Sequence, residues 1–321
     1  MRAEQDLQTD ALRPAEPAAD HAETPADQTD PAHSAAAPVE AVTDAGRRVA
    51  EQRMYRALVD RTVGIPQGPA ARDGWAQEAP ELRASWRMLK EKHGYEERPE
   101  PTPQADGGSW RGKGGRTLDA ARNAEVDRGY ARIREVGDNV IVPAILRVAA
   151  EDPTRALAGF DRRIKGADRL KEKISDRMRS KGRSATDALA QISDVVRFTF
   201  TYRENAYADG VRKDLGRLEA AGFTQVERRN TWASDQYKGI NTQWLEPQSG
   251  VRFEVQFHTQ ASLEAKELTH QAYERIRTIT ESTPVTERET AELTQFQRRV
   301  NSIIPIPPDV SDIDNYPPGG H

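Results

Sequence analysis

The stretch Val251-Arg252-Phe253-Glu254-Val255-Gln256-Phe257-His258-Thr259 decides how this chain folds, because apolar and polar side chains alternate along it without a break. Side chains on a β-strand point to opposite faces with a period of two residues. One face of this strand is therefore wholly apolar and packs on a core. The other face carries a cation, a carboxylate, an amide and an imidazole in one row. Taken alone, such a row is also typical of a strand face that is merely solvated.

The sequence around this strand alternates between helical and strand patterns. Helices are indicated by apolar side chains at helical spacing and by glycines that end them, and strands by β-branched and aromatic runs. The predicted order is helix, strand, helix, three strands and helix, at residues 165–182, 195–202, 205–221, 224–230, 240–246, 251–259 and 261–279. This order predicts an α+β, α/β-like domain with a mixed β-sheet of about four to five strands flanked by helices.

Composition divides the 321 residues into five parts. The first part, residues 1–45, holds ten acidic and two basic side chains and almost no branched apolar residues, which is typical of disorder. These residues have a net charge of −8. Because the formal net charge of the whole chain is −4, the remaining residues have a net charge of +4. The predicted parts are a disordered acidic Ala/Pro-rich tail over 1–45, two or three short helices over 46–96, a Pro/Gly linker over 97–116, the α+β domain over 117–302, and an extended Pro-rich tail over 303–321. Two helices, at 117–135 and 143–150, are expected to open the domain.

Several classes of protein are excluded by what the sequence lacks. The chain contains no cysteine, so disulfides, thiolate metal sites and cysteine nucleophiles are ruled out. No run approaches the roughly 18 apolar residues of a membrane span, and Met1–Asp6 does not begin a secretory signal. We therefore expect a soluble, cytoplasmic protein without a membrane partner. The acidic start and the Pro/Gly linker also fit an effector domain that is delivered into another cell.

The first candidate for chemistry is a cationic segment. Ten basic and three acidic residues lie between positions 162 and 183. Lys165, Arg169 and Lys173 are expected one helical turn apart on one helix face, with Arg163 just before them. Arginine binds phosphate through two parallel hydrogen bonds and lysine binds it as a point charge. Alone, the same row is also typical of a solvated cationic helix face.

Two further groups lie at the ends of predicted strands. Asp194 precedes the strand over 195–202, where its carboxylate could hold Mg²⁺ and leave the other positions to water and phosphate, or could cap a turn. Tyr237 and Asn241 flank Gly239, which permits a close backbone approach. A ring stacked on a base contributes about 1–3 kcal/mol. A tyrosine that merely anchors a surface turn is the alternative.

The last candidates lie on strand 251–259 and on the helix after it. Glu254 could be a second metal ligand or could accept a proton from a hydroxyl. His270, Tyr273, Glu274 and Arg277 share one helix face, and we expect this face to dock on the sheet through hydrogen bonds. The chain has no Gly-rich phosphate loop of the complete G-x-x-x-x-G-K-[ST] type, no H-E-x-x-H and no His-Asp dipeptide.

Taken in order, these pieces resemble the RelA/SpoT-type nucleotide pyrophosphokinase, or alarmone synthetase, domain, in its divergent synthetase-only or toxin-like members. The resemblance covers residues from about 155 to 280. Its four motifs are R-x-K…K at Arg163, Lys165 and Lys173; G-Y-x-S-x-H at Tyr237, Gly239 and Asn241; E-V-Q-x-R-T at Glu254, Gln256 and Thr259; and H-x-x-Y at His270 and Tyr273. The chain departs from the family's Ser at Arg169, its His at Asn241 and its Arg at His258. Asp194 lies three residues before Arg197, where the family spacing is usually five.

The resemblance implies a nucleotidyltransferase-like fold and a Mg²⁺-dependent enzyme. It would transfer pyrophosphate from ATP to the 3′-hydroxyl of a guanine nucleotide, GDP or GTP, and so make guanosine tetra- or pentaphosphate. The implied roles are phosphate binding for Arg163, Lys165, Arg169, Lys173 and Arg197; metal binding and catalysis for Asp194 and Glu254; acceptor binding for Tyr237, Asn241 and Gln256; and support for His270 and Tyr273.

Two alternatives to this function stay open at the level of the sequence. One is a toxin effector that pyrophosphorylates adenosine nucleotides or tRNA 3′ ends, with tRNA or an antitoxin as partner. The other is a non-catalytic RNA-binding module, whose binding would fall steeply with salt. The absence of a His-Asp dipeptide argues against a built-in alarmone hydrolase.

Overall fold

The structure is a computed structural model that describes residues 53, 69–95, 104–112, 115–279 and 282–317. The predicted acidic tail over 1–45 lies outside the described residues, as does the part of the predicted helical segment before residue 69 other than Arg53. Among the described residues, no helix combines the length and the apolar character needed to cross a membrane.

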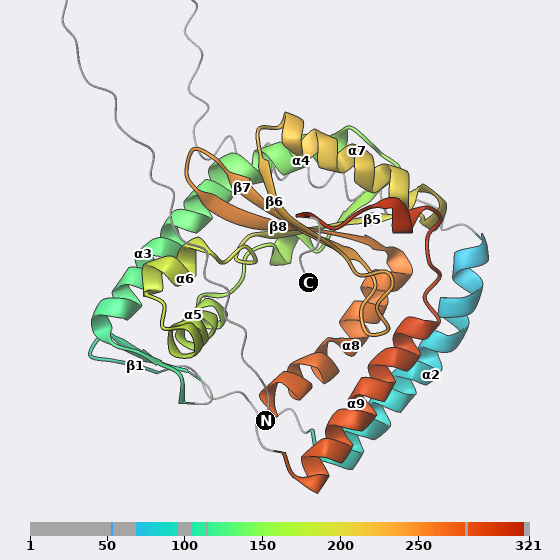
Figure 1. Ribbon diagram of the computed structural model, residues 1–321, viewed down its shortest axis with the longest axis horizontal. Helices are drawn as coiled ribbons and strands as arrows, with labels where there is room; N and C mark the ends of the chain where they lie inside the picture. Colours follow the sequence, from blue (N-terminus) through green and yellow to red (C-terminus); the bar gives the residue numbers. More distant parts are fainter. Residues whose placement is uncertain (1–52, 54–68, 96–103, 113–114, 280–281, 318–321) are drawn as a thin grey trace, which may run out of the picture. The chain divides into compact units, whose positions relative to one another are not determined.

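Five strands form one mixed sheet in the order β4-β5-β8-β7-β6 (Figure 1). Their bounds are β4 Ala156–Ala158, β5 Arg197–Tyr202, β6 Thr224–Asn230, β7 Ile240–Glu246 and β8 Val251–Thr259. β5 and β8 run parallel, and the other neighbouring pairs run antiparallel. The predicted class, α+β with a mixed sheet of four to five strands flanked by helices, is confirmed.

The α-helices in the described part of the chain are α2 Pro69–His93, α3 Ala120–Val136, α4 Val142–Ala150, α5 Ala167–Lys181, α6 Ala185–Ala190, α7 Tyr207–Ala220, α8 Gln260–Thr278 and α9 Pro284–Ser302. A π-helical turn, Gly137–Ile141, joins α3 to α4, and short 3₁₀ turns lie at Phe160–Arg162, Glu204–Ala206 and Val310–Asp312.

The alternation along β8 places one face of the sheet on a core. Phe253, Val255 and Phe257 are fully buried, and the Phe253 ring packs edge-on against Phe223 at 4.8 Å between centroids. α7 lies along this face with α4 beside it (Figure 1). The opposite face is not merely solvated near the end of the strand, because α8 turns back over it and leaves Gln256 only 5% exposed. At that end of β8, the polar row is therefore packed under α8 and is not exposed to solvent.

The predicted Pro/Gly linker over 97–116 is wrong for its described part. Residues 104–111 form a hairpin of β1 Gln104–Asp106 and β2 Ser109–Arg111, and β3 Thr117–Leu118 pairs with β2. Trp110 is buried and donates from its indole nitrogen to Asp168 of α5 at 2.9 Å. Gly107 and Gly108 form the turn of this hairpin with positive φ, and a Cβ on Gly112 would lie 2.2 Å from the Trp110 ring.

The predicted short helices before residue 96 also need correction, because α2 is one continuous helix through Pro80. Its tryptophans pack on α8 and α9: Trp86 stacks on Phe296 at 5.4 Å, and Trp75 donates to Glu264 at 2.6 Å. This packing outweighs the backbone hydrogen bond that a proline removes. α9 was not predicted, although Leu293, Phe296 and Val300 give it a buried stripe.

The Pro-rich tail over 303–321 is extended for much of its described length, but it is packed along the sheet edge. Tyr316 exchanges two backbone hydrogen bonds with Arg228 of β6, at 2.7 and 2.9 Å. The Asn230 side chain donates to the carbonyls of Val310 and Ile313. Coverage of this kind protects an edge strand from pairing with other chains.

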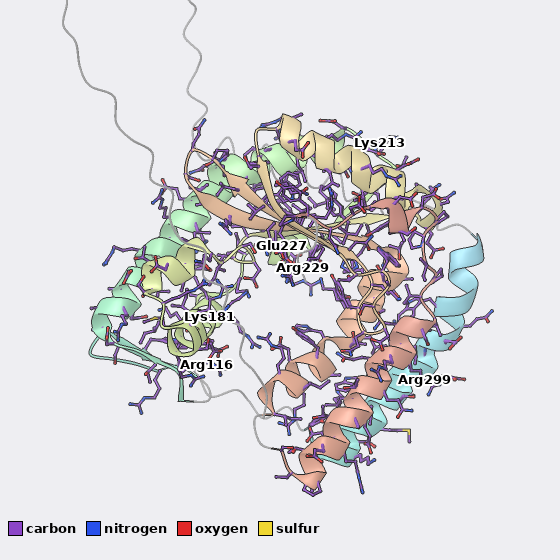
Figure 2. All side chains as sticks on the ribbon, in the orientation of Figure 1. Arg116, Lys181, Lys213, Glu227, Arg229 and Arg299 are labelled. Carbon is purple, nitrogen blue, oxygen red and sulfur yellow. The ribbon has the colours of Figure 1, made fainter. Side chains whose placement is uncertain are left out.

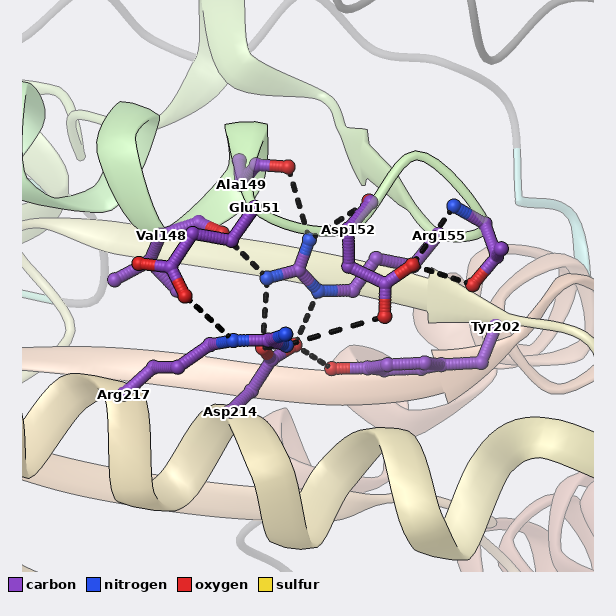
Figure 3. Close-up of polar contacts among 9 residues, drawn as sticks. Val148, Ala149, Glu151, Asp152, Arg155, Tyr202, Asp214 and Arg217 are labelled. Atoms are coloured by element: carbon purple, nitrogen blue, oxygen red, sulfur yellow. Dashed lines mark hydrogen bonds and ion pairs between the residues drawn. The ribbon is translucent and has the colours of Figure 1, made fainter.

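A buried ion pair ties β4 and β5 to α7 (Figure 3). The Arg155 guanidinium and the Asp214 carboxylate are almost fully buried and in direct contact. The Tyr202 hydroxyl donates to Asp214 at 2.6 Å, and the Arg217 guanidinium donates to it at 2.7 Å. Arg155 also donates to the carbonyls of Val148 and Ala149 at the end of α4. Since this network lies away from the polar face of β8, we assign it to the stability of the fold.

Candidate active site

Two lysines and one carboxylate form the centre of the candidate site. Lys165 Nζ donates to Asp194 Oδ2 at 2.6 Å, and Lys173 Nζ donates to Asp194 Oδ1 at 2.7 Å. Both carboxylate oxygens are thus engaged by cations. Burial by itself would raise the pKa of Asp194, but the two ammonium groups outweigh it and lower that pKa to about 2. Asp194 is therefore a carboxylate at any physiological pH.

The two lysines reach Asp194 from different local structures, which corrects one prediction. Lys165 does not lie on a helix, because α5 begins only after Gly166. Of the three predicted residues, only Arg169 and Lys173 lie on α5. Residues 163–165 instead run antiparallel to the entry of β5, with Lys165 N–H donating to Val195 O at 2.8 Å. Burial lowers the pKa of Lys173 in spite of its carboxylate partner. The Lys173 ammonium is therefore held where an anion has to neutralise it.

The Asp194 cluster is joined to β8 through the backbone. Glu254 N–H donates to Val196 O at 2.9 Å, and Arg197 lies opposite Glu254 in the parallel register of β5 and β8. Residues opposite each other on neighbouring strands direct their side chains to the same face. Glu254 and Arg197 therefore share the polar face of the sheet, and Arg197 lies three residues after Asp194 along the chain.

The predicted phosphate-binding arginines have different environments. Arg163 donates to Asp138 Oδ1 at 3.0 Å and lies over the Phe160 ring, and its buried Nε has no partner among the described residues. Arg169 is exposed and contacts Glu172 at 3.7 Å. The Arg197 guanidinium contacts no carboxylate within 4 Å among the described residues. Arg197 is thus the cation of this set that is available to a ligand on the polar face.

The polar face of the sheet continues across β8 and β7 onto β6. Gln256 donates from Nε2 to Glu254 Oε1 at 2.9 Å. On β6, Glu227 and Arg229 project from the face of the sheet opposite α4 and α7 (Figure 2), and Gln243 of β7 donates to Glu227. Charged and amide groups therefore follow one another over three neighbouring strands.

Lys266 on α8 belongs to this surface and was missed from the sequence. Its ammonium donates to Gln256 Oε1. Burial, reinforced by Arg197, lowers the pKa of Lys266 to about 8. The signal available in the sequence was its position one helical turn after Ser262, which places it back over the strand from which α8 emerges.

The structure brings together the side chains of Tyr237 and Asn241, for which the resemblance implied a role in acceptor binding. The Tyr237 hydroxyl donates to Asn241 Oδ1 at 2.8 Å and lies 3.0 Å from His258 Nε2. Burial, with the charge of Glu254 nearby, raises the pKa of Tyr237, so the phenol is neutral. Gly239 permits the close approach that was expected, since a Cβ there would lie 2.7 Å from the His258 ring.

The expected docking of the His270 face on the sheet is wrong. His270 and Tyr273 are exposed, and Arg277 lies over the Tyr273 ring at 5.5 Å while contacting Glu274 at 3.6 Å. The inward face of α8 is formed instead by small residues such as Ala265 and Thr269. Although the residue is exposed overall, partial desolvation of its imidazole, together with the repulsion from Lys266, Arg197 and Arg169, lowers the pKa of His270. His270 therefore lies near the same cations as the candidate site.

The carboxylates fit a magnesium ion that is held mainly by its substrate. The described residues contain no group of three or more His, Asp or Glu that could form a closed metal site. Mg²⁺ usually binds proteins through one or two carboxylates and takes its other ligands from water and phosphate. Asp194, ionised and flanked by the ammonium groups of Lys165 and Lys173, and Glu254 supply such a set. A surface cavity between α4 and the β7–β8 turn shares no residue with it.

No family model and no curated protein matches the chain, but solved structures do. One is the small alarmone synthetase 1 from Bacillus subtilis bound to its product pppGpp, at 17% identity and a TM-score of 0.37, covering 56% of this chain and 95% of that one. A second structure of that synthetase gives 16% and 0.38, covering 58% and 93%. A GTP pyrophosphokinase family protein from Streptococcus pneumoniae gives 11% and 0.36, covering 58% and 91%.

The protein is thus structurally similar to small alarmone synthetases and GTP pyrophosphokinase family proteins, at low sequence identity. At these TM-scores the superpositions are loose. We therefore base the functional proposal on the residues of the site.

Proposed function

We propose that this protein is a Mg²⁺-dependent pyrophosphokinase that transfers the β,γ-pyrophosphate of ATP to the 3′-hydroxyl of a nucleotide, with GDP or GTP as the preferred acceptor. The observation that carries the proposal is the meeting of Lys165 and Lys173 at Asp194, at 2.6 and 2.7 Å, beside the strand pair that carries Arg197 and Glu254. A triphosphate and its metal need such a mixture of cations and carboxylates.

In this proposal the cations hold the donor. Lys165, Lys173 and Arg197 bind the ATP phosphates, with Arg163 and Arg169 at the margin. When the nucleotide enters, its phosphate oxygens replace the Asp194 carboxylate as partners of the two lysines, and Asp194 becomes free to bind the metal. Bound Mg²⁺ would supply neutralisation of the charge on the phosphates. The lysines would also hold the β-phosphate in line with the attacking oxygen.

Glu254 is the proposed catalytic base. The acceptor 3′-oxygen forms a bond to the β-phosphorus of ATP while the bond from that phosphorus to the α,β-bridging oxygen breaks, and AMP leaves. The 3′-hydroxyl proton passes to the Glu254 carboxylate, whose orientation is set by the Gln256 amide at 2.9 Å. General base catalysis of this kind contributes about 10²–10⁴ in rate. The Tyr237 ring stacks on the acceptor base, and the Asn241 amide bonds to its edge.

The test is incubation of the full chain with labelled ATP and Mg²⁺ and, in separate reactions, GDP, GTP, ADP or tRNA. We expect a 3′-pyrophosphorylated guanine nucleotide and AMP in equal amounts, and no product without Mg²⁺. Glu254→Gln should lower turnover at least about a hundredfold, whereas Glu219→Gln, on the exposed side of α7, should not change it. Transfer to ADP or tRNA in place of GDP would correct the acceptor. No transfer, together with salt-sensitive RNA binding, would favour the RNA-binding module.

A further inference from the structure

His258 is a fully buried imidazole that none of the roles above uses. It lies at the end of β8, between the Tyr237–Gly239 turn and the first turn of α8, and its exposed fraction is 0%. A buried polar side chain has to be fully hydrogen-bonded to be tolerated. Its Nε2 lies 3.0 Å from the Tyr237 hydroxyl, and its Nδ1 lies 2.9 Å from Ser262 Oγ.

The hydrogen-bond directions determine which nitrogen carries the proton. The Tyr237 hydroxyl donates to Asn241 Oδ1 at 2.8 Å, so its oxygen is left to accept from the imidazole. His258 is therefore protonated on Nε2. Its Nδ1 accepts from the Ser262 hydroxyl, for which it is a nearer acceptor, at 2.9 Å, than the Thr259 carbonyl at 3.2 Å. Burial lowers the pKa of His258 well below its ordinary value, which keeps this imidazole neutral.

This arrangement occupies the whole polar end of Tyr237. Its hydroxyl donates to Asn241 and accepts from His258, so it has no proton left to donate to a ligand. The planes of the two rings are 89° apart, with centroids at 5.6 Å. The imidazole therefore meets the phenol at its hydroxyl end and does not stack on a ring face. What Tyr237 can offer a ligand is its ring.

Gly239 holds the imidazole from the other side. A Cβ on Gly239 would lie 2.7 Å from His258 Cε1 and 3.1 Å from Nδ1, which is closer than real Cβ contacts. The backbone of Gly239 is not in the left-handed region, so alanine is allowed there by its torsions. Glycine is required by the ring beside it.

We propose that His258 is a positioning residue that holds the Tyr237 ring in place for a flat, purine-type acceptor base. This rests on the proposed function, in which Tyr237 stacks on that base. Two side chains hold the Tyr237 hydroxyl. The imidazole of His258 comes from β8, and the amide of Asn241 comes from β7, four residues after Tyr237. The inference concerns how the acceptor binds and leaves the donor side of the site unchanged.

The kinetic test compares His258→Leu, His258→Gln and Tyr237→Phe with the wild type. Stacking depends on a fixed ring, so we expect His258→Leu and Tyr237→Phe each to raise the acceptor KM about tenfold, with the ATP KM within about twofold. Gln can donate from an amide near the position of Nε2, so His258→Gln should recover most of this loss. Because the two groups act as one unit, the double variant His258→Leu, Tyr237→Phe should be about as impaired as either single variant. His93→Gln, in the remote α2–α9 contact, is the control.

A second measurement does not depend on activity. In protein with labelled tyrosine, the Tyr237 hydroxyl proton should exchange slowly with water, and Tyr237→Phe identifies its NMR signal. We expect this signal to be lost in His258→Leu and in Gly239→Ala. If the wild type transfers pyrophosphate to no acceptor, the proposed function fails, and the hydroxyl signal still decides whether His258 holds Tyr237. A persistent signal in His258→Leu or in Gly239→Ala, or additive effects on the acceptor KM, would overturn the inference. If His258→Leu does not fold, Gly239→Ala, His258→Gln and Tyr237→Phe decide the matter.

Discussion

Replacing Asp194 by asparagine should change stability and its dependence on pH in a way that the structure sets. The side chain is 19% exposed and accepts hydrogen bonds from two ammonium groups. Its pKa falls from 3.8 to about 2 on folding. At about 1.4 kcal/mol for each pKa unit, this contributes about 2 kcal/mol to the free energy of unfolding. The lowered pKa of Lys173 offsets part of that gain, so about 2 kcal/mol is an upper bound.

The sign follows from the direction of the shift. A carboxyl whose pKa is lower in the folded state binds its proton less tightly there, so its contribution is complete above about pH 4. It is lost as the pH falls toward the folded value of about 2. We therefore expect Asp194→Asn to be less stable than the wild type by up to about 2 kcal/mol at pH 7. The difference should shrink as the pH is lowered from 4 to 2.

The assay is urea unfolding of both proteins at pH values between 7 and 2.5, followed by circular dichroism. The informative quantity is the difference between the two free energies of unfolding, since other carboxylates with lowered pKa values, such as Asp152 and Glu289, contribute equally to both proteins. Asp187→Asn, at the exposed N-terminus of α6, is a matched control. A difference at pH 7 that is absent, or that stays constant down to pH 2.5, would refute the account of the Lys165–Asp194–Lys173 cluster.

Three other predictions concern different parts of the molecule. Lys266→Met should remove the hydrogen bond that orients the Gln256 amide and lower turnover about tenfold, with an unchanged melting temperature; unchanged turnover would contradict a role for α8 in the site. Arg155→Met should lower the free energy of unfolding by about 3 kcal/mol, because it leaves Asp214 buried with fewer partners; a loss below about 1 kcal/mol in urea unfolding would show that Arg217 compensates. Removal of residues 303–321 should expose the β6 edge and promote association detectable by light scattering, and a truncated chain that stays monomeric would mean that the edge is protected in another way.

The parts of the fold that were predicted correctly are those with local signals. The alternation of β8 and the β-branched run of β5 located the central strands to within two residues. The glycine after residue 181 marked the end of α5. Such patterns succeed because the period of a strand or a helix is imposed by its own backbone.

The parts that were missed depend on distant partners. The Gly-rich segment around Trp110 forms strands because the Trp110 indole is hydrogen-bonded to Asp168, 58 residues further along the chain. Pro80 is tolerated within α2 because the tryptophans around it pack on α8 and α9. Lys266 and His258 were not chosen as site residues, because a single lysine or histidine carries no local signal of what it will contact.

The sequence by itself determined the order of the central elements, the apolar and polar faces of β8, and the set of cations and carboxylates. Only the tertiary structure decided that Lys165 and Lys173 meet at one carboxylate, and that His258 and Tyr237 share a hydrogen bond. The physical reason is that periodicity specifies the direction of a side chain relative to its own backbone. Which groups then lie within hydrogen-bond distance depends on how separate elements pack together.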